Sequence, residues 1–467
     1  MADNDIPGIV IPDVVEALGS RVARAGGELY IVGGWVRDAI RGVDCRDVDL
    51  ATSLDTREVR DALRGIGSAY DLGEKFGTIG SLAGDYTLEI TTFREEEYEP
   101  GSRHPRVSPA AGIRDDLARR DFTINAIALP IAPSRGKPVD PFGGRADIER
   151  GLIRTPGDPG PRMAEDPLRM MRAARFAAQL GYDVDPGLLA VLGRDPSLLD
   201  SISWERRRDE LEKTLRADHP DTGVRILVQT GLMEHVAPEI AAMEGVEQPR
   251  AYHRANVLEH TLLTLAYVDA DPLLRRAALF HDIGKPPAKI TEPKTMFPEH
   301  DKIGERLTRD AMRRLRYSND DIQKTSFLVR RHMRPIQYKS DWSDAAVRRI
   351  VRDCVLMTEG SVTVPLDAVF ELARADILAG SLQTTGPNLA LLEELGRRID
   401  AVQAETRVEE IRSPLDGREL MEAFARGPGP WIKETKEHLV HLVIEGELGQ
   451  EDKAAALLRA GEFLHDR

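Results

Sequence analysis

Strand-like patterns are confined to the first third of this 467-residue chain. Leu29–Val32 is predicted to be a short buried strand, and 48–52 and 87–93 show the pattern of further strands. From residue 157 to the end, apolar residues recur at helical spacing between short breaks of Pro, Gly or Asp. Such a chain is predicted to fold as an α/β head followed by a long helical body.

Charge and composition exclude several classes of protein. The formal net charge of -14 excludes an overall basic nucleic-acid binder but not a local basic surface. No apolar run approaches the roughly 18–20 residues that cross a bilayer, and the first residues show no secretory signal. The two cysteines, Cys45 and Cys354, indicate reduced thiols rather than a disulfide framework. We therefore expect a cytoplasmic protein with no membrane partner.

A glycine pair follows the first predicted strand and precedes a predicted helix over 36–41. Gly33 and Gly34 let backbone N–H groups approach a phosphate, and Arg37 adds positive charge. A glycine pair at a strand-to-helix turn is also common for purely structural reasons. The turn is therefore a candidate phosphate site that depends on its surroundings.

Carboxylates at alternate positions mark the second predicted strand. Asp47 and Asp49 lie on one face of this strand, while Val48 points to the other. The repulsion between the two carboxylates favours binding of divalent cations, and hard oxygen ligands suit Mg²⁺. Bound Mg²⁺ can clamp a triphosphate and activate an attacking hydroxyl. Glu89, on the polar face of 87–91, is a candidate third carboxylate. The alternative for all three is an ordinary solvated strand surface.

The segment 115–126 places charged and amide side chains around an apolar core pattern. Arg119 and Arg120 are candidates for contacts with phosphate or ribose, and Asn125 is a candidate for orienting a sugar hydroxyl. The alternative is a salt-bridged face exposed to solvent.

Five motifs occur in order along the chain: GGWVRD (33–38), DVD (47–49), RRDFTINA (119–126), DPFGG (140–144) and EDPLR (165–169). Together they resemble the class II tRNA nucleotidyltransferases, the CCA-adding enzymes of the DNA polymerase β-like superfamily. Bacterial poly(A) polymerases share these motifs. The resemblance covers roughly residues 28–216 and implies an α+β protein, with a mixed sheet in the head and an elongated all-helical neck, body and tail.

The resemblance also assigns roles to the residues of the head. Catalysis is assigned to Asp47, Asp49 and Glu89, with Mg²⁺ held by the two aspartates. Nucleotide binding is assigned to Gly33, Gly34, Arg37, Arg120 and Asn125.

A predicted helix over 166–180 places Asp166 and Arg169 on one face. Cytosine and adenine offer an exocyclic amine beside a ring-nitrogen acceptor, so a carboxylate and a guanidinium would accept both bases and repel uracil and guanine. In the resembling family these positions read the base, and the positions of Arg172 and Arg175 also contact nucleotide. The alternative is a charged outer helix face.

Histidines and aspartates of the helical body lie in segments that resemble the HD superfamily of metal-dependent phosphohydrolases. The candidate ligands are His260, His281, Asp282, His300, His332 and Asp376. Imidazole and carboxylate donors suit a transition metal or Mg²⁺, so a second divalent metal is expected here. The alternative is a degenerate domain that only packs tRNA.

The two resemblances divide the chain into four segments: a catalytic head (1–153), a base-reading helical neck (154–225), an HD-like metal domain (226–385) and a helical tail (386–467). They imply template-independent addition of C, C and A to the 3′ end of tRNA from CTP and ATP, with release of pyrophosphate. An additional phosphohydrolase activity is expected of the HD-like domain.

The sequence suggests four alternative functions and disfavours three of them. A metal phosphohydrolase with the head as an RNA-binding module is disfavoured by the intact head carboxylates. Poly(A) polymerases usually have a basic, histidine-containing form of 73–79, and CC-only enzymes lack much of 94–116, which is predicted here to be a full-length loop. An A-only enzyme has a head of the same appearance. The sequence leaves that alternative and the oligomeric state open.

Overall fold

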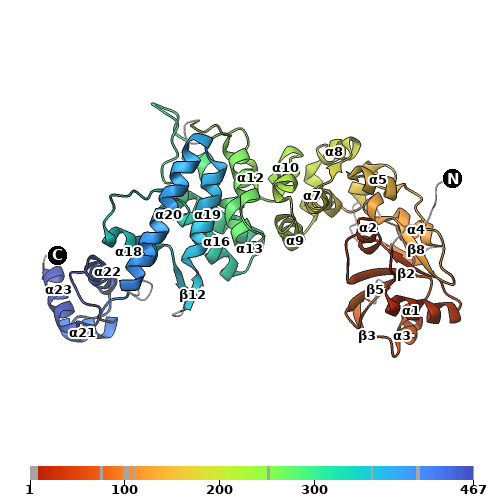
Figure 1. Cartoon of the computed structure of the whole chain (residues 1–467), viewed down its shortest axis with the longest axis horizontal. Coiled ribbons are helices and arrows are strands. Elements are labelled where there is room, and N and C mark those ends of the chain that lie inside the picture. Colours follow the sequence, from red (N-terminus) through yellow and green to blue (C-terminus); the bar gives the residue numbers. More distant parts are fainter. Residues whose placement is uncertain are drawn as a thin grey trace. The chain divides into compact units, whose positions relative to one another are not determined.

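The computed structural model describes residues 9–73, 77–97, 106–109, 112–249, 253–358, 361–405 and 411–465. Its contacts divide the chain into two compact units, Met1–Val236 and Ala237–Arg467 (Figure 1). The finer division into four segments stays a prediction. Among the described residues, no helix combines the length and the apolar character that crossing a membrane requires.

The head is built on a six-stranded mixed sheet with the strand order β3-β4-β5-β2-β1-β8. β2 and β5 run parallel, and the other neighbouring strands run antiparallel. The strands are β1 (Leu29–Val32), β2 (Asp47–Thr52), β3 (Ser68–Gly73), β4 (Thr78–Ala83), β5 (Tyr86–Thr92) and β8 (Ala128–Ala132). The expected α+β fold with a mixed sheet in the head is confirmed.

Helices pack beside this sheet in the first unit (Figure 1). They are α1 (Asp13–Arg24), α2 (Gly34–Ile40), α3 (Thr56–Leu63), α4 (Ile113–Ala118), the 3-10 turn η2 (Thr123–Asn125) and α5 (Gly144–Arg150). α1 is amphipathic, and it buries Val15, Leu18 and Val22 at helical spacing. α3 begins with a capping box in which Asp55 and Glu58 satisfy each other's backbone N–H groups.

The predicted long loop over 94–116 is wrong in part. Its flanks form an antiparallel pair of strands, β6 (Arg94–Glu97) and β7 (Arg106–Pro109). Both strands are polar in sequence and lack the alternation of apolar residues that is typical of a strand packed on a core. Hydrophobic periodicity therefore did not predict them. Residues 98–105 and 110–111 of this segment lie outside the described part of the chain.

The neck follows the head within the first unit. Its helices are α6 (Pro159–Glu165), α7 (Leu168–Leu180), α8 (Pro186–Leu192), α9 (Trp204–Leu215) and α10 (Pro220–Gln229), with 3-10 turns η3 (Pro196–Ser201) and η4 (Leu232–His235). Two short strands, β9 (Leu152–Ile153) and β10 (Asp183–Val184), pair in parallel. α7 is central, because it packs against both α9 and α10 and most of its residues are buried.

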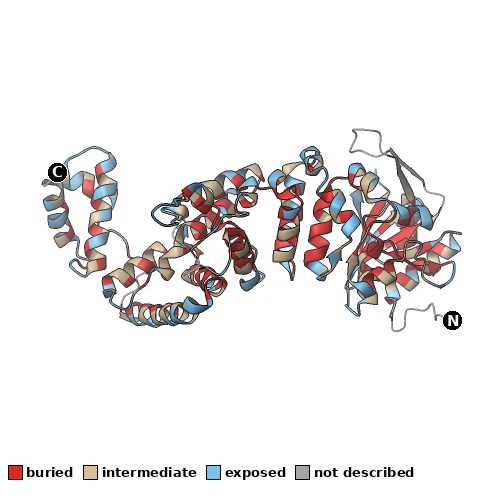
Figure 2. Ribbon diagram, turned by 90° about the horizontal axis from the view of Figure 1, so that it is seen from above, coloured by how far each residue is buried: buried red, intermediate tan, exposed pale blue. Residues whose placement is uncertain are grey.

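The second unit is almost entirely helical. Its helices are α11 (Pro238–Ala241), α12 (Val257–Tyr267), α13 (Pro272–Phe280), α14 (Lys285–Ala288), α15 (His300–Arg314), α16 (Asn319–Arg331), α17 (Met333–Ile336), α18 (Asp344–Asp353), α19 (Leu366–Ala379), α20 (Leu382–Glu405), α21 (Gly417–Phe424), α22 (Pro430–Glu445) and α23 (Lys453–His465). A small hairpin, β11 (Leu356–Thr358) and β12 (Ser361–Val364), interrupts them. α12, α13, α16 and α19 pack together. Figure 2 shows that in the helical parts of the chain buried residues lie where helices meet and exposed residues lie on their outer sides. The last three helices share their own apolar cluster around Leu420, Trp431 and Leu439.

Candidate functional site

The predicted carboxylates of the head lie on two adjacent parallel strands. Asp49 of β2 is directly opposite Glu89 of β5, and Asp47 is opposite Thr87. Residues in register on neighbouring strands present their side chains on the same face, so Asp47, Asp49 and Glu89 share one face of the sheet. Val48 between the two aspartates is buried on the other face.

The electrostatics of these carboxylates favour a bound cation. Burial raises the pKa of Asp49, and neighbouring Asp47 adds to this, although Arg120, the Gly34 N–H group and Arg37 oppose it. Partial burial and the charge of Asp49 raise the pKa of Glu89. A divalent cation relieves this repulsion, and an all-oxygen donor set fits Mg²⁺.

The glycine turn packs directly against this carboxylate face. Gly33 has a φ of 70°, and a Cβ atom there would lie 2.8 Å from Oδ2 of Asp49 and 3.0 Å from Nη1 of Arg120. Gly34 begins α2, where a Cβ atom would lie 3.6 Å from Nη2 of Arg37. The structure therefore brings together five of the predicted residues, and only glycine fits the first position of the turn.

Arg37 is linked to the neck through a chain of hydrogen bonds. Its Nη1 donates to Oδ1 of Asn125 at 2.9 Å, and Nδ2 of Asn125 donates to Oδ1 of Asp121 at 3.0 Å. Arg172 of α7 donates to Oδ2 of the same aspartate through Nε at 2.9 Å. Although burial opposes ionisation, Arg172 and Asn125 hold the pKa of Asp121 well below its usual range. These contacts connect the predicted phosphate turn to the predicted base-reading helix.

One aromatic ring lies among three of the predicted arginines. The guanidinium carbons of Arg37, Arg172 and Arg175 lie 5.5, 5.5 and 4.3 Å from the ring centroid of Phe176. Arg175 also pairs through Nε with the buried Glu210 of α9 at 3.2 Å. Cation–π contacts and the ion pair fix the directions of these side chains.

Arg119 and Arg120 share a fully buried carboxylate. Nη2 of Arg119 lies 2.6 Å from Oδ1 of Asp116, and Nη2 of Arg120 lies 3.2 Å from Oδ2. Against the opposing effect of burial, the two arginines lower the pKa of Asp116. The alternative of a salt-bridged face exposed to solvent is therefore correct in its ion pairs but not in their exposure, since Asp116 is buried, and Arg120 also lies beside Asp49.

The predicted helical face shared by Asp166 and Arg169 is wrong. α7 begins at Leu168, and Asp166 has an extended backbone (φ −139°, ψ 96°) between α6 and α7, because the following Pro167 disfavours helical geometry at this position. Nη1 of Arg169 donates to Oε2 of Glu165 at 2.9 Å, and Nη2 donates to the Arg119 carbonyl at 3.0 Å. The base-reading role of both residues stays a prediction.

Three functional candidates of the head and neck were missed at the level of sequence: Asp121, Phe176 and Glu210. Asp121 had a usable signal, since it lies inside the RRDFTINA motif and four residues before Asn125. Phe176 follows Arg175 and has the pattern of a core residue. Glu210 lies in the segment 203–213, which resembles the last neck motif of the family and is expected to brace the base-reading helix, but its burial depends on how α7 packs against α9.

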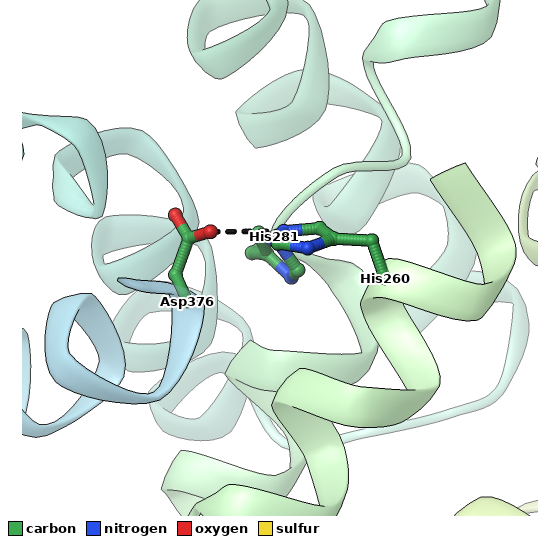
Figure 3. A group of neighbouring side chains, drawn as sticks. All are labelled: His260, His281 and Asp376. Atoms are coloured by element: carbon green, nitrogen blue, oxygen red, sulfur yellow. Dashed lines mark ion pairs between the residues drawn. The ribbon is translucent and has the colours of Figure 1, made fainter. Parts of the chain in front are cut away.

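All six predicted ligands of the HD domain come together in the second unit. They form two groups, His260 with His281 and Asp376, and Asp282 with His300 and His332. Nε2 of His260 lies 2.9 Å from Oδ1 of Asp376, and Figure 3 shows the first group converging from separate helices. Asp376 therefore lies beside the two histidines, and its role as a metal ligand stays a prediction.

The backbone fixes the tautomers of the histidines. Nδ1 of His281, His300 and His332 lies 2.7 to 2.9 Å from a carbonyl oxygen three residues earlier in the chain. A carbonyl only accepts, so each Nδ1 is the protonated nitrogen and each Nε2 is directed at the cluster. Within the described chain, Nε2 of His260 and of His281 makes no hydrogen bond although it is buried. This donor set fits a metal ion, since ligating histidines are held in this way.

The ionisation states also suit metal binding. Burial, with a smaller effect of neighbouring histidines, lowers the pKa of His332 to about 3. His281 and Lys285 hold the pKa of Asp282 well below its usual range, against the effect of burial. Although burial opposes it, the Asp282 carboxylate raises the pKa of His281, so metal binding to this imidazole must displace a proton.

A cavity of about 550 Å³ opens beside the cluster. His300 and Asp376 line it together with His253 and Lys285, two residues for which no role was predicted. The His253 ring packs against His260 with centroids 4.7 Å apart, and Nζ of Lys285 lies 2.6 Å from Oδ2 of Asp282. Lys285 follows Asp282 by three residues and His281 by four, a spacing that was visible in the sequence.

Family models match most of the chain. The Poly A polymerase head domain matches residues 29–154, and the probable RNA and SrmB-binding site of polymerase A matches residues 181–244. The HD domain matches residues 250–378.

Relatives and solved structures agree with these matches. An A-adding tRNA nucleotidyltransferase of Deinococcus radiodurans is 32% identical over 92% of this chain and 94% of its own length. A CCA-adding enzyme of Bacillus pumilus is 35% identical over 62% of this chain and 68% of its own length, and two further CCA-adding relatives are matched over 53% and 54% of theirs. The Bacillus stearothermophilus CCA-adding enzyme in complex with CTP superimposes with a TM-score of 0.66 at 26% identity, covering 98% of this chain and 100% of that one. The chain therefore belongs to the tRNA nucleotidyltransferase family, with a poly(A) polymerase-type head and an HD domain.

Proposed function

We propose that this protein adds C, C and A to the 3′ end of tRNA from CTP and ATP, without a nucleic-acid template. Its main support is the convergence of Asp49, Glu89, Gly33 and Arg120 on one face of the head sheet. The Bacillus pumilus relative is a CCA-adding enzyme, and so is the similar solved structure that holds CTP.

The chemistry follows from the residues that meet there. The terminal ribose hydroxyl attacks the α-phosphate of the nucleotide, and pyrophosphate leaves. We assign Asp47 and Asp49 to Mg²⁺, which when bound neutralises charge on the phosphate oxygens and favours deprotonation of the hydroxyl. Gly34 and Arg37 hold the phosphates, and Arg120 contacts the nucleotide beside Asp49.

Addition of the terminal A alone is a second candidate. It is favoured by one observation: the relative that matches along nearly the whole chain is an A-adding enzyme. Both candidates use the same head chemistry, and they differ in whether CTP is accepted.

Two tRNA substrates separate the candidates. One ends before CCA and the other ends after CC, and each is given CTP and ATP separately and together. A CCA-adding enzyme extends the first by three nucleotides when both triphosphates are present. An A-only enzyme extends only the second. Failure to extend either substrate would contradict both candidates.

Poly(A) synthesis and CC-only addition are disfavoured by the sequences of 73–79 and 94–116. Residues 74–76 and 98–105, within these two segments, lie outside the described residues, so this argument rests on sequence alone. A head that only binds RNA is disfavoured by its interlocked carboxylates, glycine turn and arginines, because RNA binding alone requires no cluster of carboxylates.

Asp166→Ala is expected to weaken base selection more than triphosphate binding. The Asp166 side chain accepts one hydrogen bond of 3.2 Å from the Leu168 N–H and lies 3.9 Å from Arg206, so its loss costs little stability. One lost base-edge contact is worth about 1–3 kcal/mol, so incorporation of U and G should rise roughly tenfold or more relative to C and A. Misincorporation kinetics with all four triphosphates measure this, and Asp183→Ala, at an exposed position, is the control. If the Asp166→Ala variant excludes UTP and GTP as strongly as the unsubstituted protein, Asp166 does not read the base.

We further propose that the HD domain hydrolyses phosphate esters, at tRNA ends or on a 2′,3′-cyclic phosphate, with a divalent metal held by the six clustered ligands. Lys285 lines the cavity beside these ligands, where its Nζ pairs with Asp282 and donates to Oε1 of Gln248. The free thiols of Cys45 and Cys354 support a cytoplasmic location for both activities.

The combined variant His281→Ala and Asp282→Ala should lose tightly bound metal and all hydrolysis, while nucleotide addition by the head continues. Both side chains are buried in the cluster, and the head site lies in the other unit. Metal analysis, phosphodiesterase assays with Mg²⁺, Mn²⁺, Co²⁺ and Ni²⁺, and tRNA extension measure the three outcomes. If the unsubstituted protein binds no metal and hydrolyses no phosphate ester, the HD domain only packs against tRNA.

A further inference from the structure

The carboxylate face of the head sheet continues beyond Glu89 to the edge of the sheet. Asp49 is in register with Glu89 of β5, and Glu89 is in register with Gly80 of β4. Gly80 is in turn in register with Tyr70 of the edge strand β3. Residues in register present their side chains on the same face, so Tyr70 shares a face with the carboxylates, about two strand spacings from Glu89.

A glycine lets the Tyr70 ring lie against the sheet. A Cβ atom at Gly80 would lie 2.5 Å from Cε2 and 2.6 Å from Cζ of Tyr70. The same atom would lie 2.8 Å from Cδ1 of Leu72. The Tyr70 ring therefore leans from β3 over β4, in the direction of Glu89, through the space that a side chain at position 80 would fill.

The surface around this ring is apolar and exposed. Tyr70, Leu72 and Leu82 are 37%, 50% and 57% exposed. Leu82 lies two residues after Gly80 on β4, so its side chain is on the same face as the Tyr70 ring. Neighbouring exposed apolar side chains of this size indicate an interaction site, and this one adjoins the catalytic carboxylates.

The position of the glycine turn decides which substrate reaches this surface. Gly33 packs against Asp49 from the β1 side of β2. Glu89 and Tyr70 lie on the other side of β2, where the strand order continues through β5 and β4 to β3. In phosphoryl transfer the attacking and leaving oxygens are roughly in line, on opposite sides of the phosphorus atom. With pyrophosphate held at the glycine turn, the attacking ribose hydroxyl approaches from the β5 side.

The incoming nucleotide is not expected to occupy the apolar surface. Its phosphates are assigned to the turn that contains Arg37, and Arg37 is linked through Asn125 and Asp121 to Arg172 of the neck. The base of that nucleotide is therefore directed to the neck. The strand that supplies the hydroxyl is left to extend over β4 and β3.

We propose that Tyr70 stacks on a base at the 3′ end of tRNA, and that Leu72 and Leu82 complete a platform that holds this end at the carboxylates. Aromatic rings exposed on a sheet stack on single-stranded bases with little dependence on the base, because every base has a π face. Such tolerance suits a strand end that grows during the reaction. The inference rests on the proposed nucleotide addition for the direction from which the strand enters.

Kinetics with tRNA ending after CC and with ATP test the platform under either proposed specificity. Tyr70→Ala should raise the KM for tRNA roughly five- to hundredfold, the range of one base–aromatic stack. The KM for ATP and kcat at saturating tRNA should stay unchanged, because the stack is present in both the ground state and the transition state. Tyr70→Phe and Tyr70→Trp keep a ring and should keep the KM of the unsubstituted protein. Tyr86→Ala, a half-buried tyrosine that shares the opposite face of the sheet with Leu88, is the matched control.

Gly80→Ala tests the position of the ring rather than its presence. The added methyl group must displace the Tyr70 ring, so this variant should also raise the KM for tRNA. An unchanged KM for tRNA in both Tyr70→Ala and Gly80→Ala would overturn the platform.

Fluorescence measures the stack without catalysis. 2-Aminopurine replaces the last or the penultimate base of the tRNA, and binding is followed in an Asp49→Asn background, in which extension is not required. Adding Tyr70→Ala should increase the fluorescence of bound tRNA at one of the two positions, because a stacking partner that quenches it is lost, whereas adding Tyr86→Ala should not. A head that binds tRNA with this stack but never extends it would refute the proposed function alone. Extension with no dependence of fluorescence on Tyr70 would refute the platform alone. The platform would also be wrong if Tyr70→Ala converts an oligomer into a monomer in sedimentation without changing the KM for tRNA, since the surface would then join two copies of the chain.

Discussion

Asp49→Asn is expected to lower nucleotide addition by roughly 10²–10³-fold or more, because it removes a metal ligand at the point where charge develops in the transition state. Asn has nearly the same shape, so β2 and its pairing with β5 persist. The assay follows extension of tRNA with radiolabelled CTP and ATP. Asp47→Asn should act in the same direction.

The same substitution should stabilise the metal-free fold at neutral pH. The pKa of Asp49 is raised in the folded protein, chiefly by burial, so ionisation of this group opposes folding above its ordinary pKa. Asn removes that cost. The melting temperature without divalent ions should therefore rise at pH 7, and the gain should disappear as the pH falls below the ordinary pKa of an aspartate.

Asp85→Asn is the matched control on the same sheet. Asp85 lies in the turn between β4 and β5, its side chain is 81% exposed, and it is 3.9 Å from Arg46. Neither activity nor melting temperature should change there. Normal turnover by Asp49→Asn would contradict the assignment of Mg²⁺ to this site.

The catalytic face of the head could be predicted because its determinants are local. A strand has a side-chain period of two, so Asp47 and Asp49 had to share a face, and β1 was found with its observed bounds. The partnership with Glu89 followed only from the parallel pairing of β2 with β5, which no local pattern specifies.

The failures have physical causes of the same kind. The helix of the neck was extended too far because the 3.6-residue period continues through Asp166, yet Pro167 forces extended backbone before it. The sequences of β6 and β7 have no apolar alternation from which strands could be predicted. In the HD domain the six ligands were found by motif, but their division into two groups depends on the directions of helices far apart in the sequence.

Gly33→Ala is expected to reduce nucleotide addition about 10²-fold, because misplacing a reacting group by about 1 Å costs that much. The new Cβ would lie 2.8 Å from Oδ2 of Asp49 and 3.0 Å from Nη1 of Arg120. Both atoms must move, and both belong to the proposed catalytic face. The Gly33 backbone, with a φ of 70° and a ψ of −137°, lies in a region that residues with a Cβ atom rarely adopt, which adds a strain of roughly 1–3 kcal/mol. Steady-state kinetics should show the loss mainly in kcat.

Gly42→Ala separates the two effects of that methyl group. Gly42 has a similar φ of 74°, but none of the described residues comes within 4 Å of a Cβ built there. Both variants should lose stability through backbone strain, measured by thermal unfolding. Only Gly33→Ala should lose activity, since only its methyl group displaces Asp49 and Arg120. If the two variants lose activity equally, strain alone explains the effect, and the close packing of the glycine turn against the carboxylates has no catalytic role.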